Sequence, residues 1–81
     1  MYTSGIIKLI ENEFLPGTGI KIGERDSLFR SNLLDSMMLV RLISRIEEDY
    51  NIQISSREII PANFDTVGSI VKFIEKKVRN K

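Results

Sequence analysis

The sequence predicts an all-α fold: a small bundle of three main helices with one short helix and a long first loop. Apolar residues recur at three- and four-residue spacing in three separate stretches, as on the buried face of a helix. Residues 51–55 alternate like a strand, but no second good strand appears to pair with them. At 81 residues the chain predicts one domain, residues 1–81, with a core from about 4 to 78 and a basic tail over 79–81.

The first expected helix begins at a cap, Thr3 or Ser4, and stops at Pro16-Gly17. Its buried stripe consists of Ile6, Ile7, Ile10 and Phe14.

Residues 17–35 form a long extended loop, with Ile20 and Ile22 buried beneath it. Leu28 and Phe29 are expected to anchor one helical turn of this loop in the core. A loop this long in a compact domain is unusual and is often functional.

The second expected helix runs from about Ser36 to Tyr50, with Asp35 as its N-cap and Ser36 in its first turn. Its core stripe is Leu39, Leu42, Ile43, Ile46 and Tyr50. The helix ends in the acidic run 47–49, which opposes the helix macrodipole. This run is either a solvated charged segment or a partner contact.

The rest of the chain is expected to close the bundle. Residues 51–55 form a linker that buries Ile52 and Ile54, and a short turn of helix ends at Pro61. Phe64 plugs the core, and Asp65 or Thr66 caps the last helix. The buried face of that helix is Val67, Ile70, Val71, Ile74 and Val78, with Phe73 at one edge.

Composition excludes several classes of function. The chain has no cysteine and no histidine, which argues against a zinc site and against a Ser-His or Cys-His nucleophile. A self-contained enzyme is therefore not expected. No apolar run reaches the roughly 20 residues that span a bilayer, and the N-terminus lacks signal-peptide features. We expect a cytoplasmic monomer without membrane insertion.

The net charge of +1 is unevenly distributed, because residues 72–81 carry a net charge of +4 and residues 1–71 a net charge of −3. A basic helix C-terminus interacts favourably with the macrodipole, and we prefer this explanation to a nucleic-acid surface. A small DNA-binding domain is a competing hypothesis. The acidic run 47–49 argues against it, because these residues would repel the phosphates of DNA.

The stretch from Asp35 to Val40 is the candidate functional site. As a dipeptide, Asp35-Ser36 fits simple helix capping. The four apolar residues 37–40 that follow wrap nearly the whole helix circumference, so one or two must be exposed beside Ser36. Exposed apolar groups favour a docking surface, and a helix N-terminus favours a phosphate group.

At these residues the sequence resembles the acyl and peptidyl carrier proteins. Leu33-Leu34-Asp35-Ser36-Met37 looks like their phosphopantetheine attachment motif, with aspartate before the modified serine and a hydrophobic residue after it. The resemblance extends over about residues 6–78 and includes the end of the second helix and the segment 63–67.

The resemblance implies a four-helix acyl-carrier-like bundle with 4'-phosphopantetheine esterified to Ser36 and flanked by Asp35. A phosphopantetheinyl transferase would attach this arm from coenzyme A, and its thiol would carry an acyl or aminoacyl group as a thioester. Downstream acyl-accepting enzymes would take up the cargo. The partner-facing residues would be Met37, Met38, Val40, Arg41, Ser44 and Arg45.

Some features depart from the carriers of fatty acid synthesis, whose second helix is typically acidic. Here Arg41 and Arg45 occupy that helix, and Leu33-Leu34 replaces a glycine-containing approach. The chain looks more like free-standing aminoacyl or D-alanyl carriers, which an adenylating enzyme loads. A fatty-acid or polyketide carrier is the alternative, and an unmodified carrier-like scaffold is an alternative of a different class.

Overall fold

The computed structural model describes residues 2–14, 17, 22–30 and 35–79. Four α-helices and one 3₁₀ turn appear in the order α1 (Tyr2–Phe14), α2 (Ser36–Tyr50), η1 (Ser56–Glu58), α3 (Pro61–Phe64) and α4 (Val67–Arg79). The described part of the chain contains no strand. The all-α prediction of three main helices and one short helix is thus confirmed.

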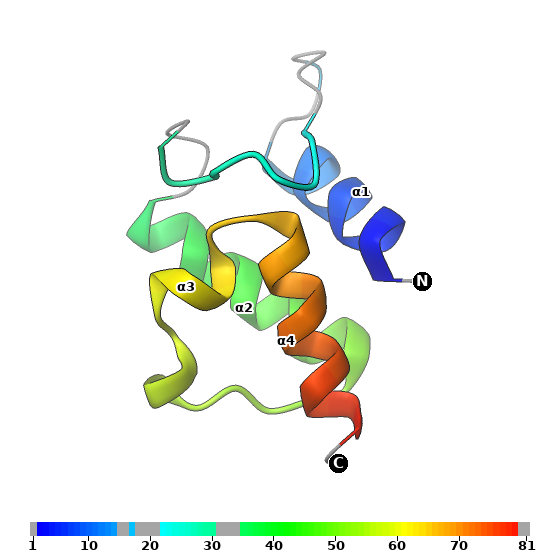
Figure 1. Cartoon of the computed structure of the whole chain (residues 1–81), viewed down its shortest axis with the longest axis vertical. Coiled ribbons are helices and arrows are strands. Elements are labelled where there is room, and N and C mark those ends of the chain that lie inside the picture. The colour runs from blue at the N-terminus through cyan, green and yellow to red at the C-terminus, as the bar shows by residue number, and fades with distance from the viewer. Residues whose placement is uncertain (1, 15–16, 18–21, 31–34, 80–81) are drawn as a thin grey trace.

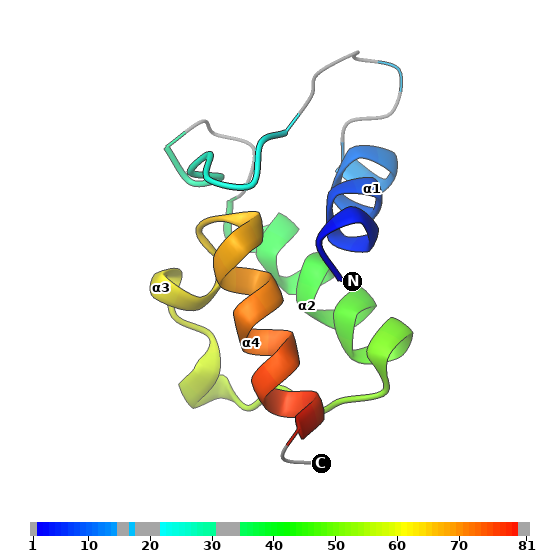
Figure 2. The same ribbon diagram turned by 45° about the vertical axis from the view of Figure 1, so that its right-hand side comes forward.

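Helix α4 lies at the centre of the bundle, with α1 on one side of it and α3 on the other (Figures 1 and 2). The side chains that face inward form one apolar core, which consists of Ile6, Leu9, Ile10, Ile22, Leu28, Leu42, Ile43, Ile46, Ile52, Phe64, Val67, Ile70, Val71, Phe73 and Ile74. Every helix except the 3₁₀ turn contributes to this core. Burial of this shared apolar surface is the main force that holds the short helices together.

Helix α2 has the predicted bounds. Asp35 caps its N-terminus, and Asn51 ends it in the left-handed conformation (φ 53°), where its N–H donates to the Glu47 carbonyl. Leu42, Ile43 and Ile46 are buried, while Leu39 and Tyr50 are partly buried against the core. The helical periodicity of this stretch therefore identified its inner face correctly.

The first helix starts earlier than predicted. It begins at Tyr2, so Thr3 and Ser4 lie inside its first turn and do not precede it as caps. The Tyr2 ring packs edge-on against Tyr50, with 5.2 Å between ring centroids. This contact gives the first turn a tertiary partner that local propensity does not reveal.

Two predictions at the other end of the chain were also wrong. Pro61 begins α3 and does not end the preceding turn, because proline at the first helical position loses no intrahelical hydrogen bond. Val78 is 36% exposed, whereas Phe73 is buried against Phe64 at a centroid distance of 5.2 Å. The apolar period of α4 therefore continues one turn beyond its buried face.

Several smaller predictions are confirmed. Ile22 and Leu28 are buried, Phe29 and Ile54 are partly buried, and Phe64 is fully buried. Leu9 also belongs to the core, although the predicted stripe of the first helix omitted it. The expectations for the Phe14 side chain, Pro16, Ile20, Leu33 and Leu34 lie outside the described residues.

Candidate functional site

Ser36 is the first residue of α2, and its side chain is exposed. The preceding Asp35 is in an extended conformation, and its Oδ1 accepts a hydrogen bond from the Met38 N–H at 2.9 Å. The Asp35 carbonyl accepts from the Leu39 N–H at 2.8 Å. The capping prediction is confirmed, and the cap fixes the Ser36 hydroxyl at the positive end of a 15-residue helix.

The apolar run after Ser36 divides between solvent and core. Met37 is 78% exposed and Val40 is 62% exposed. Met38 and Leu39 are partly buried and pack against the core. The expectation that one or two of these residues face solvent beside Ser36 is confirmed, and the two exposed side chains give the start of α2 an apolar surface.

The predicted partner-facing residues farther along α2 are also exposed. Val40, Arg41, Ser44 and Arg45 line a shallow hollow of about 290 Å³ together with Glu13 and Glu48. The structure thus brings these predicted residues together on one face of α2 with the end of α1.

Arg45 is engaged within the chain. Its Nε lies 3.2 Å from Asp49 Oδ1, and its Nη1 pairs with Glu13 on α1. The hydrogen bond to Asp49 is the main reason that the pKa of Arg45 is raised, with the charges of Asp49 and Glu13 adding to it. Arg45 therefore links α1 to α2, a role that the sequence pattern did not indicate.

The acidic run at the end of α2 also has internal partners. Glu47 Oε2 accepts from the Ile54 N–H at 2.8 Å, and Asp49 binds Arg45. The two explanations offered from sequence, a solvated run or a partner contact, both missed these bonds. Glu47 holds the linker that follows the helix, which explains an acid placed against the macrodipole.

A network of hydrogen bonds holds the described part of the first loop. Asp65, at the turn between α3 and α4, accepts from the Ser27 hydroxyl at 2.6 Å and from the Phe29 N–H at 3.4 Å. Its carbonyl accepts from the Leu28 N–H at 2.6 Å. These bonds fasten the loop that leads to α2 onto the turn between α3 and α4.

Two further bonds support the same loop. The Gly68 N–H donates to the Glu24 carbonyl at 3.0 Å, and the Ile22 N–H donates to Glu11 Oε2 at 3.2 Å.

Sequence reasoning assigned Asp65 or Thr66 as the cap of α4. Thr66 is that cap, since its Oγ1 accepts from the Ser69 N–H at 3.0 Å. Asp65 thus acts as a clamp on the first loop. Its bond to Ser27 joins residues 38 positions apart, so no local sequence signal reveals it.

Within the residues that the structure describes, no cluster of three or more acidic side chains could hold a metal ion. In the same residues, no helix is both long enough and apolar enough to cross a bilayer.

Comparisons with known proteins agree with this architecture. Residues 6–74 match the family described as having a phosphopantetheine attachment site. The chain is 32% identical over 76 residues to the probable acyl carrier protein PigG of Serratia sp. (strain ATCC 39006), an alignment that covers 94% of this chain and 87% of that protein. A chain in the crystal structure of an FAD-dependent dehydrogenase superposes with a TM-score of 0.78 and 28% identity, over 86% of this chain and 99% of the other.

Proposed function

The chain belongs to the phosphopantetheine-binding family of carrier proteins, and we propose that Ser36 is the residue to which its 4'-phosphopantetheine arm is attached. This arm is the covalent prosthetic group of the family, and its thiol holds an acyl group as a thioester. The chain itself brings no cysteine thiol and no histidine base, so partner enzymes supply the chemistry.

The single observation that best supports Ser36 is its place as the exposed first residue of α2. An exposed hydroxyl is open to a modifying enzyme, and a phosphodiester formed there lies at the positive end of the helix. Asp35 orients this helix start through its bond to Met38, and Met37 and Val40 present apolar surface beside it. The residues present therefore fit the group.

In the modification reaction, the Ser36 oxygen attacks the phosphorus atom of coenzyme A that bears the pantetheine. A new P–O bond forms to Ser36, and the pyrophosphate P–O bond breaks to release adenosine 3',5'-bisphosphate. The hydroxyl proton passes to a base of the phosphopantetheinyl transferase.

Intact-mass measurement after incubation with coenzyme A and a promiscuous transferase tests the site. We expect wild-type protein and Ser4→Ala to gain one phosphopantetheine, and Ser36→Ala to gain none. Ser4 is a matched control because it is an exposed helical serine outside the partner-facing residues of α2. A gain that persists in Ser36→Ala contradicts the proposal. No gain in folded wild-type protein with several transferases favours the unmodified scaffold.

We further propose that an adenylating enzyme loads the arm with an amino acid or another carboxylic acid. The resemblance of Leu33-Leu34-Asp35-Ser36-Met37 to free-standing aminoacyl carriers supports this loading route over fatty-acid or polyketide synthesis. Arg41, exposed on α2, supports a loading enzyme with an acidic patch.

The charge match can be tested by reversing one arginine. Arg41→Glu is the cleaner variant, since Arg45→Glu would also break the link between α1 and α2. We expect Arg41→Glu to lower kcat/KM for loading about tenfold. Lys8→Glu, at an exposed position of α1, should change kcat/KM little. Equal loading of both variants rejects the acidic patch, and loading by a malonyl transferase alone favours the alternative route.

The similarity to a chain in the FAD-dependent dehydrogenase structure supports a candidate downstream enzyme. In this proposal a flavoenzyme oxidises the cargo on the arm. Two hydrogens leave adjacent cargo atoms as a hydride and a proton, a double bond forms, and FAD becomes FADH₂. Incubation of the loaded carrier with that dehydrogenase should remove the mass of two hydrogen atoms from the carrier. An unchanged mass, with the flavin still oxidised, rejects this partner.

A further inference from the structure

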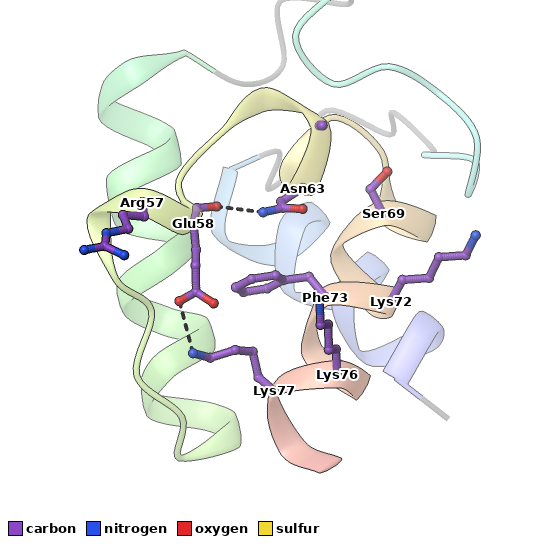
Figure 3. A pocket seen from close by; sticks show the side chains of 9 residues that line it. Arg57, Glu58, Asn63, Ser69, Lys72, Phe73, Lys76 and Lys77 are labelled. Carbon is purple, nitrogen blue, oxygen red and sulfur yellow. Dashed lines mark hydrogen bonds and ion pairs between the residues drawn. The ribbon is translucent and has the colours of Figure 1, made fainter. Parts of the chain in front are cut away.

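A second hollow lies away from Ser36, between η1, α3 and α4 (Figure 3). Its volume is about 510 Å³, and its lining includes Arg57, Glu58, Lys72, Phe73, Lys76 and Lys77. Phe73 is buried and Asn63 is held by a bond of 2.9 Å to the Glu58 carbonyl. We refer to this site as the basic hollow.

The basic hollow carries an excess of positive charge. Four cations line it against one acid, Glu58, which pairs with Lys77 at 3.0 Å. Arg57, Lys72 and Lys76 are exposed and make no ion pair with the residues that the structure describes. Lys72 and Lys76 also lie four positions apart on α4, where like charges destabilise a helix.

The fold accounts for only part of this charge. Lys76 and Lys77 belong to the last turn of α4, where cations interact favourably with the helix macrodipole. Lys72 lies near the middle of α4, and Arg57 lies on η1, so the macrodipole of α4 explains neither. Two cations from separate elements thus line the hollow without such a stabilising role in the fold.

We propose that the basic hollow docks an acidic segment of a partner protein, with an apolar side chain of that segment against Phe73 and Ala62. Opposite charge across an interface supplies specificity and speeds association. A volume of about 510 Å³ has room for a few side chains, which favours a short peptide segment. The rest of the chain disfavours a nucleic acid, because the residues outside the hollow carry a net charge of −2, which would repel phosphates.

This inference rests on the proposed function, since the partner is an enzyme that handles the carrier's cargo. The hollow would bind an acidic segment of that enzyme while the arm on Ser36 reaches the active site of the enzyme. The two proposals fail separately: modification of Ser36 is read by mass, and occupancy of the hollow is read by binding.

The test is a titration of the full chain, carrying its arm, with an acetylated and amidated peptide Asp-Glu-Phe-Glu-Asp, followed by amide chemical shifts. We expect saturable shifts on η1, α3 and α4, and a Kd that rises with ionic strength. Arg57→Gln/Lys72→Gln should raise the Kd about fivefold. Glu58→Gln should lower the Kd, because it makes the hollow more positive.

The matched control is Lys8→Gln/Arg25→Gln, which removes the same charge from exposed positions outside the hollow. It should leave the Kd within about twofold of wild type. Equal weakening by both double variants, shifts that map to α2, or tighter binding to duplex DNA or to anionic vesicles each overturn the proposal. The neutral peptide Asn-Gln-Phe-Gln-Asn should not bind.

Discussion

Asp35 and Ser36 are adjacent in sequence but have different physical roles at the start of α2. The Asp35 carboxylate faces the backbone and accepts from the Met38 N–H, whereas the Ser36 side chain is exposed. A capped helix start holds the serine in one orientation, which favours recognition by a modifying enzyme. The aspartate is thus a positioning residue for the proposed attachment site.

Replacing the cap should cost stability in proportion to the lost hydrogen bond. We expect Asp35→Ala to lower the free energy of unfolding by about 1 kcal/mol, and Asp35→Asn to lower it by only a few tenths, because Asn also caps well. Urea denaturation monitored by circular dichroism measures both. Equal losses in the two variants would mean that the charge, and not the cap, stabilises the helix.

Glu58 is the residue whose titration should affect stability. The Ser55 N–H donates to its Oε1 at 2.9 Å, and Lys77 adds an ion pair. The backbone bond is the main reason that the pKa of Glu58 is lowered from 4.5. Because its folded pKa is the lower one, Glu58 stabilises the fold fully above pH 4.5 and loses this effect as the pH falls through the folded value.

Glu58→Gln should therefore destabilise the protein at neutral pH but much less in acid. Urea denaturation of wild type and variant at about pH 7 and about pH 3 gives the difference in unfolding free energy at each pH. We expect a difference at neutral pH that shrinks in acid. A difference that is constant between the two conditions would show that the carboxylate charge does not contribute.

At the scale of elements, the first loop depends on one residue of the α3–α4 turn. Asp65 accepts from Ser27 and Phe29 through its side chain, and from Leu28 through its carbonyl. We expect Asp65→Ala to lower the free energy of unfolding by about 1–3 kcal/mol, since it removes the carboxylate acceptor of Ser27 and Phe29 and leaves only the backbone bond to Leu28. Amide exchange across residues 22–30 should also accelerate.

Asp26 provides the control for this prediction. Its carboxylate accepts a local bond from the Gly23 N–H, three residues earlier in the chain, at 2.8 Å. Asp26→Ala should therefore change stability by less than about 0.5 kcal/mol. Similar exchange rates in both variants would contradict the clamp role of Asp65.

The elements differ in how much of them the sequence could reveal. Helix α2 was predicted with its bounds because a strong cap and a regular apolar stripe agree. The start of α1 was missed because the Tyr2–Tyr50 contact is tertiary. Val78 fits the apolar period of α4, but the period alone does not reveal that it is 36% exposed, because exposure depends on tertiary packing.

The candidate site also contains features that the sequence reveals and features that it does not. Ser36 and the exposed Met37 and Val40 follow from local pattern and helix geometry. The engagement of Arg45 by Glu13 and the clamp at Asp65 join residues far apart in sequence, so no short motif reports them. The basic hollow likewise forms only when η1, α3 and α4 come together in the folded chain.

The whole molecule depends on a single small core. Phe64 has no exposed surface and packs on Phe73, which joins α3 to α4 beneath the turn that holds Asp65. A chain of this length has a free energy of unfolding of roughly 5–15 kcal/mol, so one core residue can decide whether it folds. The loop clamp, the start of α2 and the basic hollow all depend on that core.

We therefore expect Phe64→Ala to lower the free energy of unfolding by about 3–5 kcal/mol, a large part of the total, because a cavity replaces the buried ring. Ile60→Ala is the matched control: Ile60 is 46% exposed on the segment before α3, and its loss should cost less than about 1 kcal/mol. Urea denaturation compares the two. If they destabilise the protein equally, α3 is not part of the cooperative core. If Phe64→Ala is the more damaging, the proposed modification of Ser36 should fall with the folded fraction, because the exposed serine is presented by the folded start of α2.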